Sequence, residues 1–136
     1  AGILLTKVIR NKESYDNNFL IVDSAMNDIL RPALYDAYHE VVSVKEYKRE
    51  EELIDYQVVG PICETGDIIC RKASLNKTKD GDLLVIKFAG AYGAVMSSFY
   101  NSRDLVPEIM ISNKKINIIR KRVLIEDFIS YEKIPL

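Results

Sequence analysis

Apolar and polar residues alternate over short stretches along most of the chain. Runs of this kind, bounded by Gly, Pro, Asn and Asp, predict short strands with one buried face. Because residues 11–18 and 112–114 are polar, the first two and the last two strands are predicted to form hairpins. The sequence predicts strands at residues 3–10, 19–23, 40–44, 56–59, 67–72, 82–88, 108–111 and 115–120.

Helical patterns are rare by comparison. Residues 123–131 repeat apolar side chains near the helical period, which predicts a short helix at the end of the chain. Residues 24–30 are expected to form a turn or a short helix, and Pro32 disfavours helical backbone at Arg31. Residues 45–55 are strongly charged and are interpreted as a solvated loop or an exposed edge. Seven or more strands with one or two short helices predict a single all-β sandwich or barrel.

One stretch, residues 58–67, combines strand signals with reactive side chains. An apolar run ends at Gly60-Pro61, Cys63 and Glu64 follow side by side, and a Thr-Gly-Asp turn leads into the next apolar run. This pattern predicts two strands joined by a tight corner that displays the thiol and the carboxylate. The alternative is that Cys63 is a small buried filler and Glu64 is a solvated turn acid.

A second stretch, residues 89–94, places Tyr92 among glycines and alanines. Neighbours with almost no side chain allow a ligand or another backbone to come close, so Tyr92 could reach a bound group. The alternative is a glycine-rich bulge around a core tyrosine.

Composition and charge exclude several classes of function. The chain has 136 residues, of which 48% are hydrophobic and 29% charged, which is typical of one globular domain. Its net charge of -1 gives no field that would attract nucleic acid or an anionic membrane, and the basic residues 120–122 are interpreted as a solvated strand end. No membrane span or signal peptide is recognised, so we expect a cytosolic setting.

The two cysteines fit neither a zinc site nor a disulfide framework. Cys63 and Cys70 lie seven residues apart with no His nearby, and both are predicted to be free thiols. No glycine-rich phosphate loop or strand-helix alternation supports a dinucleotide fold. The chain starts at Ala1 without an initiator Met and runs directly into a strand, so we expect a cut inside a longer protein.

Five segments, in order and at their spacing, resemble the C-terminal domain of the diaminopimelate decarboxylases. The resemblance covers nearly the whole chain. The segments are residues 22–28 (VDSAMND), 31–37 (RPALYDA), 59–67 (VGPICETGD), 81–84 (GDLL) and 90–98, which begin with GAYG and end with MSS.

This resemblance implies a fold-type III enzyme that uses pyridoxal 5'-phosphate. Such enzymes have an N-terminal (β/α)8 barrel with the Schiff-base lysine and a C-terminal β-domain of sandwich or Greek-key barrel type. Residues 1–136 would be the second domain only, and the barrel would be absent from this chain. The family removes carbon dioxide from the D-centre of meso-diaminopimelate to give L-lysine. It acts as a homodimer with active sites between the subunits.

The resemblance also implies roles for individual residues that bind substrate. Arg31 and Tyr35 match positions that hold the distal carboxylate of the substrate, to which a guanidinium can pair bidentately. Glu64 matches the carboxylate that binds the distal ammonium.

Further roles concern the chemistry and the cofactor. Cys63 matches the thiol that enters the partner subunit's site, where it is suited to protonate the substrate after carbon dioxide leaves. Tyr92 matches a tyrosine that reaches the cofactor phosphate and contributes to substrate binding. Tyr100 lies where related decarboxylases present an aromatic residue near the dimer interface.

Three departures from the family pattern leave these contacts in place. Ser24-Ala25 stands where Ala-Gly is usual, Thr65 replaces a common Ser, and Phe99 replaces a common Asn. The Cys-Glu pair differs from the Cys-Asp pair usual in ornithine and arginine decarboxylases.

Other functions stay open at this point. The chain could belong to a catalytically inactive homologue that regulates a true decarboxylase, although retention of Cys63 and Glu64 speaks against this. It could also belong to a related decarboxylase for another basic amino acid, or be a free-standing β-domain that binds a ligand or protein.

Overall fold

The computed structural model describes residues 2–15, 17–47 and 52–135, and it confirms the all-β class. Among these residues, α1 and two 3-10 turns lie between strands, and a second short α-helix follows the last strand. The elements are β1 (Ile3–Glu13), β2 (Asn18–Val22), α1 (Arg31–Tyr35), β3 (Val41–Ser43), β4 (Leu53–Val59), β5 (Ile68–Asn76), β6 (Leu83–Lys87), η1 (Ala94–Met96), η2 (Tyr100–Ser102), β7 (Glu108–Ser112), β8 (Lys115–Arg120) and α2 (Ile125–Ile129).

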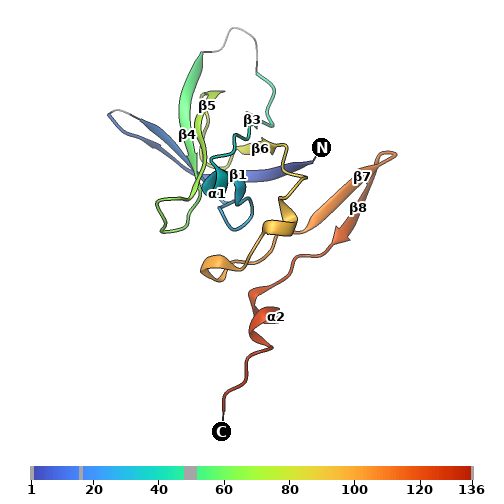
Figure 1. The fold of residues 1–136 in the computed structure, drawn as a ribbon. Helices are drawn as coiled ribbons and strands as arrows, with labels where there is room; N and C mark the ends of the chain where they lie inside the picture. Colours follow the sequence, from blue (N-terminus) through green and yellow to red (C-terminus); the bar gives the residue numbers. More distant parts are fainter. Residues whose placement is uncertain (1, 16, 48–51, 136) are drawn as a thin grey trace.

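Six strands form one strongly curved sheet in the order β3-β6-β1-β2-β4-β5. The neighbours are antiparallel except for the parallel pair β2–β4. The two end strands, β3 and β5, contact each other, so the sheet curls into a nearly closed barrel (Figure 1). The register of β1 shifts between Val8 and Arg10, near the point where its pairing passes from β6 to β2.

The core lies inside this curled sheet. Its side chains come from alternate positions of the strands, as the pattern of apolar residues predicts. Burying one such aliphatic side chain contributes about 1.5–3 kcal/mol. The most deeply buried aliphatic residues are Val8, Leu20, Val22, Ile29, Val58, Leu84 and Ile86.

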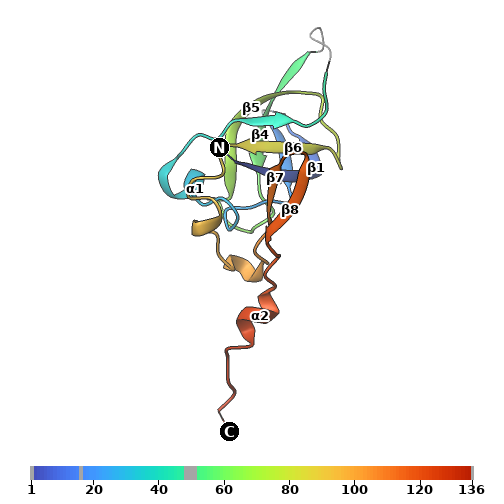
Figure 2. The same cartoon turned by 90° about the vertical axis from the view of Figure 1, so that its right-hand side faces the viewer.

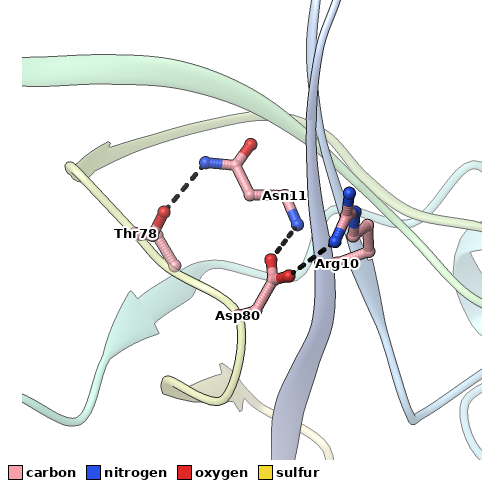
Figure 3. A network of polar contacts seen from close by, with 4 residues as sticks. All are labelled: Arg10, Asn11, Thr78 and Asp80. Carbon is pink, nitrogen blue, oxygen red and sulfur yellow. Dashed lines mark hydrogen bonds and ion pairs between the residues drawn. The ribbon is translucent and has the colours of Figure 1, made fainter.

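A polar network fastens the β5–β6 loop to β1 (Figure 3). The Asp80 carboxylate accepts a hydrogen bond from the Asn11 backbone N–H at 2.6 Å and pairs with the Arg10 guanidinium at 3.2 Å. The Asn11 side chain donates to the Thr78 carbonyl oxygen at 2.9 Å. These contacts hold the loop beside the irregular stretch of β1.

The β7–β8 hairpin forms a separate two-stranded sheet. Its turn residues Asn113 and Lys114 have φ values of 49° and 61°, as a two-residue type I′ turn requires. Figures 1 and 2 agree that α2 and the residues after it extend away from the curled sheet. A ring stack between Phe99 and Phe128, with centroids 5.2 Å apart, connects α2 to the segment around η2.

Many apolar side chains of the hairpin and the C-terminal segment are exposed. Ile111 and Ile116, which face each other across the hairpin, are 74% and 73% exposed. Other exposed apolar residues in this part of the chain are Ile109, Met110, Ile118, Ile119, Leu124, Phe128, Ile129, Tyr131 and Ile134.

The structure corrects the expectation for Arg31. A helix begins at this residue, although Pro32 was predicted to disfavour it there. Proline is tolerated in the first helical turn because its missing N–H would have no partner inside the helix. Residues 24–30 form a turn, and α1 ends at Asp36, whose φ is 52°.

Other differences are at element boundaries. β4 begins at Leu53, earlier than predicted, and α2 covers only part of residues 123–131. The charged stretch 45–55 was interpreted as a loop or an edge, and residues 48–51 of it lie outside the described residues. Both cysteines are free thiols, as predicted. No helix of the described residues is long and apolar enough to cross a membrane.

Candidate functional site

The predicted corner lies between the end of β4 and the start of β5. It is closed by hydrogen bonds from the Gly60 N–H to the Asp67 carbonyl at 3.0 Å and from the Asp67 N–H to the Glu64 carbonyl at 3.1 Å. Cys63 and Glu64 are both exposed on it. The alternative of Cys63 as a buried filler is therefore wrong, while Glu64 is solvated as that alternative expected.

The environment of Glu64 favours its charged form. Its Oε1 accepts hydrogen bonds from the Gly66 N–H and the Thr65 hydroxyl, each at 3.2 Å. These contacts, together with a smaller contribution from the Tyr100 hydroxyl, lower the pKa of Glu64 below its ordinary value. Tyr100 of η2 therefore lies near the corner. With its lowered pKa, the Glu64 carboxylate is an anion at neutral pH.

The helix α1 presents Arg31 and Tyr35 four positions apart, a spacing that puts both on one side of a helix. Arg31 is half-buried and Tyr35 is 64% exposed. Within the described residues, neither side chain makes a hydrogen bond or ion pair. A partly desolvated guanidinium without an anion is suited to bind a carboxylate.

A cavity of about 440 Å³ lies between α1 and the corner. Pro32 and Ala33 line it on the helix side, and Thr65 and Gly66 line it on the corner side. The elements that carry Arg31 and Glu64 are thus neighbours in space, although neither of these two side chains lines the cavity.

Tyr92 lies on the connection between β6 and η1. Its φ of 58° is in the left-handed region, and a Cβ at Gly93 would clash with the Ala89 carbonyl. The Tyr92 side chain is 64% exposed, and its hydroxyl makes no hydrogen bond within residues 2–15, 17–47 and 52–135. The alternative of a core tyrosine is therefore wrong, and the phenol is free to bind a group from outside the domain.

Sequence reasoning missed three polar residues that hold these segments together, namely Asn27, Asp67 and Arg103. The Asp67 carboxylate accepts hydrogen bonds from the Ile62 N–H at 2.8 Å and from the Met26 N–H at 2.7 Å. One buried side chain therefore joins the corner to the loop of residues 23–28. The signal in the sequence was weak, because an Asp after a Thr-Gly turn equally fits a solvated turn acid.

Asn27 joins the same loop to the segment that carries Tyr100. The Asn27 amide donates to the Ser98 carbonyl at 3.3 Å and accepts from the Arg103 Nε at 3.0 Å. The Ser98 N–H donates to the Asn27 carbonyl at 3.0 Å. The loop 23–28 thus lies between the corner on one side and residues 98–103 on the other.

Asp28 of the loop 23–28 and Asp67 of the corner both have a pKa above the ordinary value for aspartate. Burial raises the pKa of Asp28 and of Asp67, and hydrogen bonds from backbone N–H groups partly offset this effect. The Arg103 guanidinium lowers both pKa values by its positive charge. No cluster of His, Cys, Asp and Glu in the described residues is suited to hold a metal ion.

Comparisons with known proteins show the family of the chain. Residues 1–90 match the family model "Pyridoxal-dependent decarboxylase, C-terminal sheet domain". A diaminopimelate decarboxylase from Zymomonas mobilis is 51% identical over 133 residues, covering 98% of this chain and 31% of that protein. The chain therefore spans about a third of the length of such relatives, and 31% of the length of the Zymomonas mobilis protein.

Solved structures show the same similarity in three dimensions. A diaminopimelate decarboxylase from M. jannaschii, in complex with L-lysine, superposes with a TM-score of 0.91 at 34% identity, covering 98% of this chain and 30% of that one. The enzyme from Helicobacter pylori, also complexed with L-lysine, gives 0.84 at 39% identity, covering 94% of this chain and 31% of that one.

Proposed function

Since the chain belongs to the pyridoxal-dependent decarboxylase family and matches its C-terminal sheet domain over residues 1–90, we propose that it is this domain of a diaminopimelate decarboxylase. The full-length enzyme then converts meso-diaminopimelate to L-lysine and carbon dioxide in the cytoplasm. The regulatory homologue and the free-standing domain are less favoured, because the thiol and both sets of charged groups that the reaction needs are present.

The observation that carries the proposal is that the domain presents two complementary charges, a cation on α1 and an anion on the corner. The distal end of meso-diaminopimelate is a second amino-acid head with a carboxylate and an ammonium. Arg31 offers a cation that has no ion-pair partner among the residues that the structure describes, and Glu64 offers an exposed anion with a lowered pKa. A site of this kind distinguishes diaminopimelate from diamino acids that lack the distal carboxylate.

In this mechanism, the residues of the chain bind the substrate and supply a proton. The Arg31 guanidinium pairs with the distal carboxylate, and the Tyr35 hydroxyl donates a further hydrogen bond. The Glu64 carboxylate accepts hydrogen bonds from the distal ammonium. After carbon dioxide leaves, the Cys63 thiol delivers its proton to the substrate carbon, and the thiolate regains a proton from water.

In this proposal, the domain contacts one edge of the cofactor. Tyr92 has an exposed phenol whose hydroxyl has no hydrogen-bond partner in the described part of the chain, and it can donate a hydrogen bond to the phosphate of pyridoxal 5'-phosphate. The cofactor, when bound, disperses the negative charge that forms on the substrate carbon. Its other contacts belong to the N-terminal (β/α)8 barrel that we propose for the rest of the protein.

We propose that the exposed apolar residues of the β7–β8 hairpin and α2 form a surface that contacts another protein domain or subunit. A side chain such as Ile111, 74% exposed, is costly to leave in water when several others surround it. We assign this surface to contacts with the barrel domain or with the second subunit of a homodimer. The Cys63–Glu64 corner is then presented to the active site of the partner subunit.

The direct test is activity of the full-length protein with meso-diaminopimelate. We expect release of carbon dioxide and formation of L-lysine, both dependent on pyridoxal 5'-phosphate. Glu64→Gln should raise KM by about tenfold, because the distal ammonium loses its counter-charge. Absence of L-lysine formation by the intact, cofactor-loaded protein would remove the assignment.

A further inference from the structure

The Asp67 side chain is placed to hold the corner against another part of the chain. Its exposed fraction is 3%, although it belongs to a turn at the surface. The two carboxylate oxygens accept backbone hydrogen bonds from different segments, Oδ2 from Ile62 and Oδ1 from Met26. Its own carbonyl and N–H close the corner onto Gly60 and Glu64.

Gly60 makes room for this carboxylate. A Cβ added at Gly60 would lie 2.6 Å from the Asp67 Cγ, which is closer than real carbon atoms approach. The φ of Gly60 is not positive, so the requirement for glycine comes from the Asp67 side chain and not from the backbone. The buried position of the Asp67 side chain therefore requires a glycine at position 60.

We propose that Asp67 is a positioning residue, which fixes Cys63 and Glu64 relative to the loop that leads into α1. Ile62 directly precedes Cys63, so the hydrogen bond to Oδ2 restrains the backbone that carries the thiol. Met26 belongs to the loop 23–28, from which the chain continues through Ile29 and Leu30 to Arg31. A single carboxylate thus sets the position of the corner, which is presented to the partner subunit's site, relative to the loop that leads into α1.

The pKa of Asp67 lies above its ordinary value, chiefly because the carboxyl group is buried. Burial and the nearby Glu64 raise its pKa, while the two N–H groups and the Arg103 guanidinium lower it. An ionised carboxylate can accept on both oxygens, whereas an asparagine amide has only one acceptor and would turn an NH2 group toward a backbone donor. Asp67→Asn should therefore release one of the two segments without changing the size of the side chain.

The proposal rests on the proposed function for the roles of Cys63 and Glu64, and its test uses the full-length enzyme. Asp67→Asn should lower kcat for meso-diaminopimelate by at least about tenfold, because the proton donor is misplaced. Gly60→Ala should have a similar effect, since it displaces the same carboxylate with its charge intact. It serves as the second variant if Asp67→Asn does not fold.

The matched control is Asp80→Asn. Asp80 also accepts a backbone hydrogen bond across a loop (Figure 3). It follows the C-terminal end of β5, whereas the corner precedes the N-terminal end of that strand. This substitution should leave kcat within about twofold of the parent, as expected of a site that does not couple to the corner. An equal loss in both variants would show a general effect of loosening a loop and would overturn the proposal.

A double-mutant cycle separates positioning from loss of stability. If Asp67 acts through Cys63, the double variant Cys63→Ala/Asp67→Asn should have about the same kcat as Cys63→Ala alone. Additive losses would mean that Asp67 acts elsewhere, which overturns the proposal.

Amide hydrogen exchange gives a readout that does not depend on activity. In Asp67→Asn, peptides that contain residues 60–67 and 24–28 should both lose protection, whereas in Asp80→Asn both should keep it. Retained protection in Asp67→Asn overturns the positioning role. If Cys63→Ala itself had normal kcat, the proposed function would fail at that residue, and exchange alone would decide the role of Asp67.

Discussion

The Asp67 carboxylate accepts a hydrogen bond from the backbone N–H of Met26 at 2.7 Å, although 41 positions separate the two residues along the chain. This contact makes the corner and the loop 23–28 one structural unit. Asn27, next to Met26, extends the unit to Ser98 and Arg103. The segments that carry the proposed substrate contacts are therefore tied together by buried polar groups within a single domain.

The isolated chain is expected to have no decarboxylase activity. The residues assigned here contact the substrate or one edge of the cofactor, while the cofactor supplies the chemistry and would be bound mainly by the barrel. The measurement is release of carbon dioxide from meso-diaminopimelate by residues 1–136 with added pyridoxal 5'-phosphate. Turnover by this chain alone would contradict the division of roles between the two domains.

The isolated chain should also self-associate through the β7–β8 hairpin. Exposed apolar surface that is normally covered tends to be buried between copies when its partner is missing. The double substitution Ile111→Ser/Ile116→Ser should shift the sedimentation coefficient toward the monomer. Leu53→Ser, which removes an exposed leucine of β4 outside the β7–β8 hairpin, is the control and should leave association unchanged.

Cys63→Ala in the full-length enzyme should lower kcat by about 10²-fold or more and change KM much less. The reason is that a general acid contributes in the step after carbon dioxide has left, not in substrate binding. Steady-state kinetics with meso-diaminopimelate measures both constants. A normal kcat with only a raised KM would assign the thiol to binding.

Substrate selectivity is expected to depend on the Arg31 guanidinium, which makes no ion pair within the described residues. Lysine and ornithine lack the distal carboxylate, which leaves a partly buried charge unpaired at a cost of roughly 1–3 kcal/mol. The full-length enzyme should prefer meso-diaminopimelate at least about a hundredfold in kcat/KM, which corresponds to about 2.8 kcal/mol.

The variant Arg31→Ala should shrink this preference, mainly by slowing the reaction of the good substrate. Comparable kcat/KM values for lysine and meso-diaminopimelate in the unmodified enzyme would take these roles away from Arg31 and Glu64. The protein would then belong to another branch of the decarboxylase family.

Asp28 should make the stability of the domain depend on pH. Burial raises its pKa above the ordinary 3.8, so its stabilising contribution is complete below that value and is lost as pH rises through the higher folded-state pKa. The measurement is the free energy of unfolding by denaturant between about pH 3 and about pH 7. As pH rises over this range, Asp28→Asn should become more stable relative to the parent.

The control for this measurement is Asp55→Asn, for which the opposite sign is expected. A hydrogen bond from Lys72 has the largest effect in lowering the pKa of Asp55. A hydrogen bond from Ser74 and the positive charge of Lys72 lower it further. Its contribution is present above the ordinary value of 3.8 and is lost as pH falls through the lower folded-state pKa. A pH-independent difference between Asp28→Asn and the parent would contradict the effect of burial on Asp28.

The strands were predictable because their signal is local. In β6, the buried side chains of Leu84 and Ile86 alternate with more exposed neighbours, and the Asp80-Gly81 turn marks the approach to the strand. The corner with Cys63 and Glu64 was predictable for the same reason, since Gly-Pro and Thr-Gly-Asp mark its two sides.

Long-range pairing was not predictable from local patterns. The parallel alignment of Leu20 with Val58 depends on how the sheet curls, which no local run of residues encodes. Asp67 and Asn27 have the composition of ordinary turn residues, and only the fold shows that they are buried and shared between segments. The site residues Arg31 and Tyr35 were found through resemblance to a family, because a lone Arg or Tyr carries no local signal. Tyr92 had a local signal in its small neighbours, but its role came from the same resemblance.

The position of β1 in the middle of the sheet has a consequence for how the protein is made. Residues 3–7 pair with β6, so Ile3 finds its partner Lys87 only after that residue has left the ribosome. Pairings of such sequence separation make folding slow. During synthesis residues 8–13 of β1 can pair with β2 while residues 3–7, which include Ile3 and Leu5, still lack their partner strand β6. A nascent chain stalled before residue 83 therefore offers an aggregation-prone edge, and it is a suitable substrate for chaperones that bind apolar strands.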